Sequence, residues 1–234
     1  MRRKMKTYRY QLHTHTSPTS RCGAMTPEEL ANALYENGLA GAVLTNHFFH
    51  GNSGIDRSIG WSAFVREYEK DYIACKTAAE KYDLDIIFGI EEHIGNGLEI
   101  LVYGITPDLL RQHTELRDGR LDDYIKVVHA AGGLIFQSHP YRERYYIRTP
   151  GPIDRLDELD GVEAYNAANL PEENERAAKL AAERGLKCTA GSDGHSFGAC
   201  GRAGIATRVR PKDAIELVEL MKKGEYTLYK GEEK

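Results

Sequence analysis

The chain has 234 residues, of which 41% are hydrophobic and 28% charged, with a formal net charge of −4 at pH 7. This composition is ordinary for a globular protein, and the length suits a single α/β barrel. The acidic balance gives no general electrostatic case for nucleic acid, and no apolar run approaches the roughly 20 residues of a membrane span.

Short apolar runs alternate with helical patterns along the chain. A strand is predicted at 8–12. In the helix that follows, Thr26 is the expected N-cap, Pro27 stands at the first helical position, and Glu29 completes a capping box. The next predicted elements are a strand at 41–45, a helix at about 61–82, and strands at 85–90 and 98–105.

The second half of the chain continues this alternation. Its predicted elements are a helix at about 119–131, strands at 132–137 and 161–165, a helix at 171–184, a strand at 186–191 and a C-terminal helix at about 211–223. Alternating strands and helices with short connections predict a parallel sheet covered by helices. About seven strands favour a closed or nearly closed barrel, with an open doubly wound sheet as the alternative. We expect a single domain over residues 1–234.

Polar side chains, most of them imidazoles and carboxylates, stand just past the ends of the predicted strands. They are His13, His15, Asn46, His47, Glu91, Glu92, His93, His139, Asn166, Asp193 and His195. The carboxyl ends of parallel barrel strands open on one face, so residues distant in the sequence meet there. Imidazole and carboxylate are ligands of Zn²⁺, Mn²⁺ and Fe²⁺. The sequence therefore predicts a metal site at this face.

The ordered motifs "HTHT", "LTNH", "GIEE", "SHP" and "GSDGH" resemble those of the PHP (polymerase and histidinol phosphatase) superfamily of metal-dependent phosphoesterases. The resemblance spans about residues 8–205 and points to stand-alone bacterial members. It implies an α/β fold of TIM-like type, a distorted (β/α)7 barrel. It also implies two or three metal ions at the C-terminal face of that barrel.

The resemblance also assigns metal ligands. His13, His15, Glu91 and Asp193 would hold one ion. Glu91 and His139 would share a second ion. His47 and His195 would contribute to a third ion or would contact the phosphate.

The chain departs from the family pattern at three places. Asn46 stands where an aspartate usually precedes the histidine, and Glu99 stands where a histidine is usual. The stretch 20–22 lacks the early aspartate or histidine of many members. These departures favour one or two ions over three, and we expect two divalent ions, Zn, Mn or Fe. Cys22, Glu99 or His93 could replace missing ligands, although for Cys22 we favour an ordinary thiol.

The implied reaction is hydrolysis of a phosphate ester, most simply of a small phosphorylated metabolite or a nucleotide. Metal ions lower the pKa of bound water and neutralise phosphoryl oxygens. Asp193, His47 and His195 form the expected catalytic set, in which either histidine could protonate the leaving oxygen. Guanidinium groups bind phosphate bidentately, which suggests arginines in loops on the same face. The candidates for substrate contact are Arg142, Arg144, Arg202 and Asn166, followed by the weaker candidates Arg21 and Arg148.

Two other functions stay open at this point. One is a non-catalytic or regulatory metal-binding PHP module, and the other is a metal-dependent amidohydrolase, which also begins with H-x-H on a barrel. We expect a small phosphorylated substrate as the partner, and neither nucleic acid nor a membrane. Four cysteines in 234 residues do not indicate a disulfide framework, and the basic N-terminus lacks the apolar core of a secretory signal. We therefore expect a cytoplasmic protein of undetermined oligomeric state.

Overall fold

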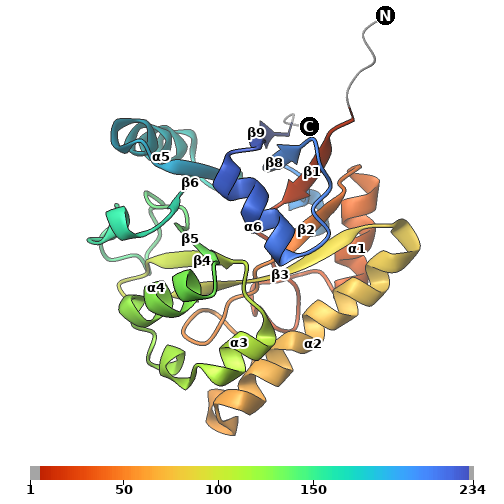
Figure 1. The fold of residues 1–234 in the computed structure, drawn as a ribbon, viewed down its shortest axis with the longest axis horizontal. Helices are drawn as coiled ribbons and strands as arrows, with labels where there is room; N and C mark the ends of the chain where they lie inside the picture. The colour runs from red at the N-terminus through yellow and green to blue at the C-terminus, as the bar shows by residue number, and fades with distance from the viewer. Residues whose placement is uncertain (1–5, 232–234) are drawn as a thin grey trace, which may run out of the picture.

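Strands occupy the middle of the molecule, and helices surround them (Figure 1). The computed structural model of the chain describes residues 6–231. The strands are β1 (Tyr8–Gln11), β2 (Gly41–Leu44), β3 (Asp85–His93), β4 (Glu99–Tyr103), β5 (Leu134–Gln137), β6 (Gly161–Asn166), β7 (Lys187–Gly191), β8 (Ala203–Thr207) and β9 (Tyr226–Lys230). The α-helices are α1 (Pro27–Glu36), α2 (Trp61–Ala79), α3 (Pro107–Gln112), α4 (Leu121–Ala130), α5 (Pro171–Arg184) and α6 (Ala214–Lys223).

The strands of the described residues form one mixed sheet, in the order β7-β6-β5-β4-β3-β2-β1-β8-β9. β1, β2 and β3 pair in parallel, as do β5, β6 and β7. β4 is antiparallel to both β3 and β5, so the two parallel groups point the same way. β8 is antiparallel to β1 and to β9.

The sheet curls until its two ends approach each other. A parallel bridge joins Thr14, just after β1, to Gly194, just after β7. The hydroxyl of Tyr226 in β9 donates a hydrogen bond of 2.9 Å to the carbonyl of Cys188 in β7. The sheet is therefore barrel-shaped and nearly closed, which confirms the predicted α/β fold of the TIM-like barrel class.

The expected sheet of about seven parallel strands is wrong in its detail. The connection between β3 and β4 covers only residues 94–98. A parallel crossover needs a dozen or more residues, so a connection this short forces an antiparallel hairpin. The strands β8 and β9 were not predicted either. The sequence "AGIAT" of β8 is rich in small residues of weak strand propensity, and pairing with β1 and β9 stabilises it instead.

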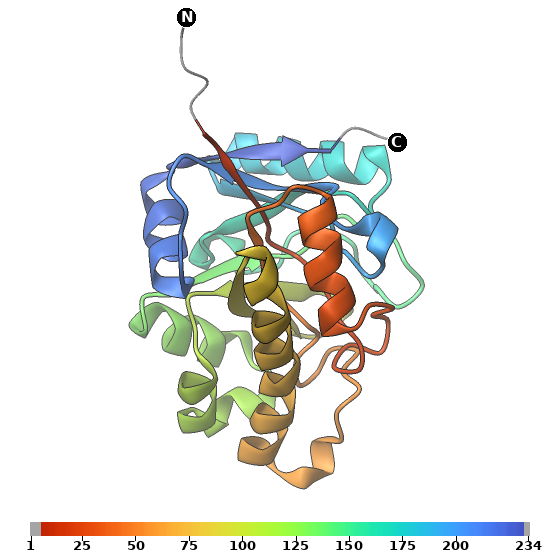
Figure 2. The same cartoon turned by 90° about the vertical axis from the view of Figure 1, so that its right-hand side faces the viewer.

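The helix α1 begins as predicted. The Thr26 hydroxyl accepts a hydrogen bond of 3.2 Å from the backbone N–H of Glu29, whose carboxylate accepts one of 2.8 Å from the N–H of Thr26. Leu30 and Leu34 are fully buried on the inner face of this helix. α1 and α2 lie side by side on the outside of the barrel (Figure 2).

The helices differ from the prediction in two boundaries and in one additional helix. The helix predicted at 61–82 is α-helical only to Ala79 and ends in a 3₁₀ turn, Glu80–Tyr82. The short helix α3 was not predicted. The C-terminal helix predicted from 211 begins at Ala214 instead, because the Asp213 side chain caps it by accepting two backbone hydrogen bonds of 2.9 Å.

The helix α6 covers the end of the barrel where the parallel strands begin. Lys222 of α6 donates a hydrogen bond of 2.7 Å to the carbonyl of Gly132, which precedes β5. Leu217, Val218 and Met221 of the same helix pack in one apolar cluster with buried side chains of the strands. A large site can therefore open only at the opposite end, where the parallel strands finish, and we call that end the barrel mouth.

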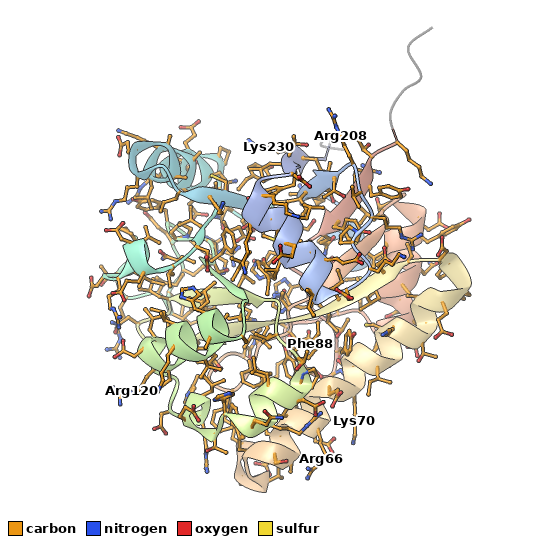
Figure 3. The ribbon with its side chains drawn as sticks, viewed as in Figure 1. Arg66, Lys70, Phe88, Arg120, Arg208 and Lys230 are labelled. Carbon is orange, nitrogen blue, oxygen red and sulfur yellow. The ribbon has the colours of Figure 1, made fainter. Side chains whose placement is uncertain are left out.

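Charged side chains lie around the periphery of the molecule, and apolar clusters pack between the sheet and the helices. Figure 3 labels Arg66, Lys70, Arg120, Arg208 and Lys230, which lie around the outside of the molecule, and Phe88, which lies within it. The side chain of Phe88 is 4% exposed. No helix in residues 6–231 has both the length and the apolar character needed to cross a membrane.

The packing of β8 leads to a first prediction. Ile205 is fully buried against strands and α6, so Ile205→Ala should lower the free energy of unfolding by about 2–5 kcal/mol. Its partner across the β8–β9 pair, Leu228, is 37% exposed, so Leu228→Ala is a matched control with an expected cost under about 1 kcal/mol. Urea unfolding measures both variants. Equal losses would show that β8 is not part of the barrel core.

Candidate metal centre

A cavity of about 500 Å³ opens at the barrel mouth. The predicted site residues on its wall are His47, Glu91, His139, Arg142, Asp193 and His195, joined there by Cys22, His93 and Glu99. His13 and His15 are fully buried and contact the carboxylates of Glu91 and Asp193. The structure thus brings together all seven residues that the sequence suggested as metal ligands.

The innermost group consists of His13, His15, Glu91 and Asp193. His13 Nε2 lies 3.1 Å from Glu91 Oε1 and 3.5 Å from Asp193 Oδ1. His15 Nε2 lies 3.4 Å from Glu91 Oε2 and 3.3 Å from the same Asp193 oxygen. The ligand atoms of His13, His15 and Asp193 all lie within 4.8 Å of one another, which is close enough for one ion.

Unpartnered nitrogen atoms point to a cation in this space. Among the described residues, His13 Nε2, His15 Nε2 and His47 Nδ1 are buried without a hydrogen-bond partner. A buried polar group left in this state costs about 1–3 kcal/mol. Nitrogen lone pairs and carboxylate oxygens aimed at a common point are what a divalent ion requires, so the donor set fits one.

Glu99 lies where the sequence left a ligand position open. His139 Nε2 lies 3.3 Å from Glu91 Oε1 and 3.4 Å from Glu99 Oε2. His47 Nδ1 lies 3.4 Å from Glu99 Oε1, and these two residues form a candidate metal group with Glu91. Because β4 runs antiparallel, its first residue lies at the barrel mouth. The departure from the usual histidine therefore leaves a carboxylate at the same place.

A third group of donors lies nearer the outside. Ring nitrogens of His15, His47 and His195 lie within 4.8 Å of one another. The rings of His47 and His195 stack on His15, with centroids 4.5 Å and 4.4 Å away. Burial raises the pKa of Cys22 beside them, but hydrogen bonding to His195 and His47 outweighs burial and lowers that pKa to about 6.

Glu163 orients the ring of His13 from behind. Its Oε1 accepts a hydrogen bond of 2.9 Å from His13 Nδ1, which leaves Nε2 of that ring free to face the site. Its Oε2 accepts from the backbone N–H of His139 at 3.1 Å and from Asn166 Nδ2 at 2.8 Å. A β-bulge between Glu163 and Tyr165 locally alters the course of β6. A Cβ at Gly191 would collide with this carboxylate, so the close approach requires glycine.

Asn46 has a structural role that explains why it can replace an aspartate. Its Oδ1 accepts hydrogen bonds from the backbone N–H of Thr16 at 2.6 Å and from the hydroxyl of Ser20 at 2.8 Å. Ser20 Oγ in turn lies 3.2 Å from His15 Nδ1. Since the Ser20 hydroxyl donates to Asn46, its oxygen can accept from His15, which leaves His15 Nε2 for the site.

Two of the candidate ligands have strained backbones. His139 has a φ of 25° and Asp193 a φ of 49°, in the left-handed region that residues other than glycine rarely adopt. Such conformations cost on the order of 1–3 kcal/mol and concentrate at functional sites. Each residue is the second one after a strand, β5 or β7, where this turn of the backbone directs the side chain toward the mouth.

The four predicted substrate-binding residues lie in different surroundings. Arg142 is buried on the cavity wall, with Nη2 2.5 Å from Asp193 Oδ2 and 2.9 Å from Asn166 Oδ1. Asn166 is fully buried behind the wall. Arg144 is paired with a carboxylate of α5, and Arg202 is exposed, and neither lines the cavity. Arg142 lines this wall, whereas the other predicted arginines do not.

The residues after Glu91 also have defined environments. Glu92 is fully buried and accepts hydrogen bonds from the backbone N–H groups of Phe49 at 3.0 Å and His50 at 2.8 Å. Burial raises its pKa to about 7. Nε2 of His93 accepts a hydrogen bond of 2.9 Å from the backbone N–H of Gly97, so this ring stabilises the β3–β4 turn.

The two carboxylates at the centre of the site are held in opposite states. Burial raises the pKa of Glu91, but His13 and His47 outweigh burial and hold it well below its usual range. Burial and the neighbouring Glu91 raise the pKa of Glu99 from 4.5 to about 8. In the absence of metal, one carboxylate is therefore ionised and the other keeps its proton up to mildly alkaline pH.

Comparison with known proteins identifies a segment and a fold. Residues 171–226, which include Asp193 and His195, match the family described as PHP-associated. No curated protein matches the chain. A two-domain protein from Bacteroides vulgatus, containing a predicted PHP-like metal-dependent phosphoesterase, is similar in fold, with a TM-score of 0.66 and 16% identity over 97% of this chain and 65% of that one.

Two further solved structures share the fold. One is a proposed metal-dependent phosphoesterase from Bifidobacterium adolescentis, with a TM-score of 0.57 and 17% identity over 81% of this chain and 88% of that one. The other is an amidohydrolase from Chromobacterium violaceum with bound sulfate and no metal, with a TM-score of 0.58 and 16% identity over 94% of this chain and 97% of that one. Together with the matched segment, they confirm the resemblance to the PHP superfamily.

The raised pKa of Glu99 leads to a prediction about pH. The pKa of this carboxyl group is about 8 in the folded state and 4.5 in the unfolded state, so the folded protein holds the proton more tightly. The free energy of unfolding of the metal-free protein therefore falls as pH rises between these two values. In a chelator, Glu99→Gln should therefore melt higher than the unsubstituted chain, by a margin that grows from about pH 5 to about pH 8. A margin that stays constant with pH would contradict the raised pKa.

Proposed function

The chain has the fold and the C-terminal segment of the PHP superfamily, and from this premise we propose that it is a metal-dependent hydrolase of phosphate esters. The observation that carries the proposal is the convergence of buried imidazoles and carboxylates at one place. Three of the imidazole nitrogen atoms lack a hydrogen-bond partner among the described residues. Hydrogen bonds alone do not account for such an arrangement.

We assign the metal ligands by position. His13, His15, Glu91 and Asp193 would hold one ion. Glu91, Glu99 and His139 would hold a second, with His47 beside them. We expect two ions, Zn, Mn or Fe. Such ions supply a nucleophilic water near neutral pH and neutralise the negative charge of phosphoryl oxygens.

The remaining groups can bind the ester and move a proton. Arg142 on the cavity wall is a bidentate donor that suits a phosphoryl group, and its pairing with Asp193 keeps the guanidinium in place. His195 is only partly buried, so its ring can reach the leaving oxygen and protonate it. His47 is the alternative acid, since it also lines the cavity.

The cavity limits the size of the substrate. A volume of about 500 Å³ suits a small phosphorylated metabolite or a nucleotide. Tyr145 and Tyr146 stand on its rim and expose their rings, fully in the first case and 47% in the second. An aromatic base or another flat group could stack on them. The four cysteines are free, which is consistent with the cytoplasmic location that we propose.

An amide substrate is the second candidate. One of the solved structures with the same fold is an amidohydrolase, and the same centre could act on a carbonyl carbon. Comparing aryl phosphates with amide and lactam substrates on one metal-loaded preparation separates these activities. Bound metal without turnover of either class would instead favour a non-catalytic PHP module.

The ligand assignment leads to a prediction about turnover. His13→Ala and Asp193→Asn each remove a donor from the inner group, so both should abolish metal-dependent hydrolysis of an aryl phosphate while circular dichroism stays unchanged. His93→Ala is the control on the same wall and should cost less than about tenfold, below the 10²–10⁴ that a general acid or base contributes. Full activity in either ligand variant would refute the assignment.

The contrast between two arginines leads to another prediction. Loss of a charged hydrogen bond to phosphate costs about 1.5–3 kcal/mol, so Arg142→Gln should lower kcat/KM by roughly 10- to 100-fold. Arg144→Gln, two residues away and outside the cavity wall, should change it by less than about twofold. Metal content measured on both variants separates substrate contact from displacement of Asp193. If the two substitutions lower kcat/KM equally, Arg142 does not contact the substrate.

A further inference from the structure

The carboxylate of Asp71, on the buried face of α2, takes no part in the site described above. This residue is only 6% exposed. Its Oδ2 accepts a hydrogen bond of 3.0 Å from the hydroxyl of Thr16 and one of 3.2 Å from the backbone N–H of Thr19. Both donors belong to the loop after β1 that also carries His15 and Ser20. Because a buried carboxylate is costly unless it is hydrogen-bonded, these contacts anchor the loop to the helix.

A chain of hydrogen bonds leads from Asp71 back to the inner group. Thr16 Oγ1, which donates to Asp71, accepts a hydrogen bond of 2.8 Å from Asn46 Nδ2. Asn46 Oδ1 accepts one of 2.8 Å from the hydroxyl of Ser20, and Ser20 Oγ lies 3.2 Å from His15 Nδ1. Four contacts between side chains therefore link the buried carboxylate to a proposed metal ligand.

The chemistry of the partners fixes the direction of this chain. A backbone N–H can only donate, and that of Thr16 faces Asn46 Oδ1 at 2.6 Å. The amide oxygen of Asn46 is therefore on that side, and its nitrogen donates to the Thr16 hydroxyl. Asp71 Oδ2 also faces a backbone N–H, that of Thr19, so this oxygen is an acceptor and the Thr16 hydroxyl donates to it.

The same reasoning places a proton on Nδ1 of His15. The Ser20 oxygen accepts the backbone N–H of His47 at 2.9 Å, and the Ser20 hydroxyl donates to Asn46. The remaining lone pair of Ser20 can only accept, so His15 Nδ1 is the donor. A neutral ring protonated at Nδ1 presents the lone pair of Nε2 to the inner group.

We propose that Asp71 is a positioning residue that holds His15 in the tautomer able to bind a metal ion. This rests on the metal-dependent function proposed above and adds a residue outside the cavity to it. In the metal-free protein the carboxylates of Glu91 and Asp193, 3.4 Å and 3.3 Å from His15 Nε2, favour a proton on that nitrogen instead. The chain of hydrogen bonds from Asp71 opposes them.

Loss of the carboxylate would favour the reversed chain. The Thr16 hydroxyl would then donate to the oxygen of a flipped Asn46 amide, whose nitrogen would donate to Ser20. The Ser20 hydroxyl would donate to His15 Nδ1, and the proton of that ring would move to Nε2. The backbone N–H of Thr16 opposes the flip, so Asn46 is held from two sides in the unsubstituted chain.

The protonation of His15 in the full-length, metal-free chain tests this assignment. Long-range proton–nitrogen NMR correlations report which ring nitrogen carries the proton. In the unsubstituted chain Nδ1 of His15 should be protonated. Asp71→Leu should move a measurable part of the population to a proton on Nε2 alone, and should weaken the binding of one Zn²⁺ equivalent by about 10- to 100-fold.

Two further variants separate this role from a general loss of stability. Asp71→Asn keeps an acceptor oxygen for Thr16 and Thr19, so it should retain both the tautomer and the zinc affinity. Asp160→Leu is the matched control, because Asp160 Oδ2 also accepts a backbone N–H, that of Ile135 at 2.8 Å, but directly precedes β6 at the opposite end of the barrel. This control should lower the thermal stability and leave both properties unchanged.

The two proposals fail in different ways. If Nδ1 of His15 lacks a proton in the unsubstituted chain, the positioning role is overturned, and this measurement needs no variant. An unchanged tautomer in Asp71→Leu, or an equal loss of zinc affinity in Asp160→Leu, overturns it too and leaves the metal-dependent function intact. If the unsubstituted chain binds no divalent ion under any loading condition, both proposals are overturned.

Discussion

The carboxylate of Glu91 is the interaction on which the rest of the site depends. One or other of its oxygens lies within 3.4 Å of a ring nitrogen of each of four histidines: His13, His15, His47 and His139. A buried carboxylate is tolerated only when positive charge compensates it, by protonated imidazoles in the free protein or by metal ions. Because it reaches every donor group, this side chain couples the inner and outer parts of the site.

The fold supplies that arrangement through the directions of its strands. The parallel strands β1, β3 and β7 end at the mouth and carry His13, Glu91 and Asp193 at or just past their ends. The antiparallel strand β4 begins at the mouth and brings Glu99 to the same place. The opposite end is filled by α6, which leaves a single open face for chemistry. The nearly closed barrel therefore positions the site and excludes water from beneath it.

Residues behind the ligands determine which nitrogen atoms are available. Glu163 engages Nδ1 of His13, and Ser20 engages Nδ1 of His15, so that both rings present Nε2 to the site. Asn46 holds Ser20 in turn. Tautomers fixed in this way, and the strained backbones of His139 and Asp193, cost free energy that the surrounding structure must offset. We interpret that cost as the price of a preorganised metal centre.

The sequence by itself determined the chemical types of the donors and their order along strand ends. That was enough to predict an α/β barrel and to assign His13, His15, Glu91 and Asp193 to one site, because the carboxyl ends of the parallel strands lie at the same face of such a fold. It also marked Glu99 and Cys22 as unexplained departures. Pattern reasoning could go no further, since a side chain's role depends on its neighbours in space.

Only the tertiary structure decided the remaining questions. The direction of β4 brings Glu99 to the mouth, and strand direction follows from pairing across the whole sheet. Arg142, Arg144 and Arg202 look alike in the sequence, yet only the first lies on the cavity wall, because loop paths are set by packing against distant elements. The strand β8 forms for the same reason, since its pairing partner β1 lies at the other end of the chain. The local sequence pattern indicates the chemical type of a side chain. Long-range packing determines which other side chains it contacts, and therefore its role.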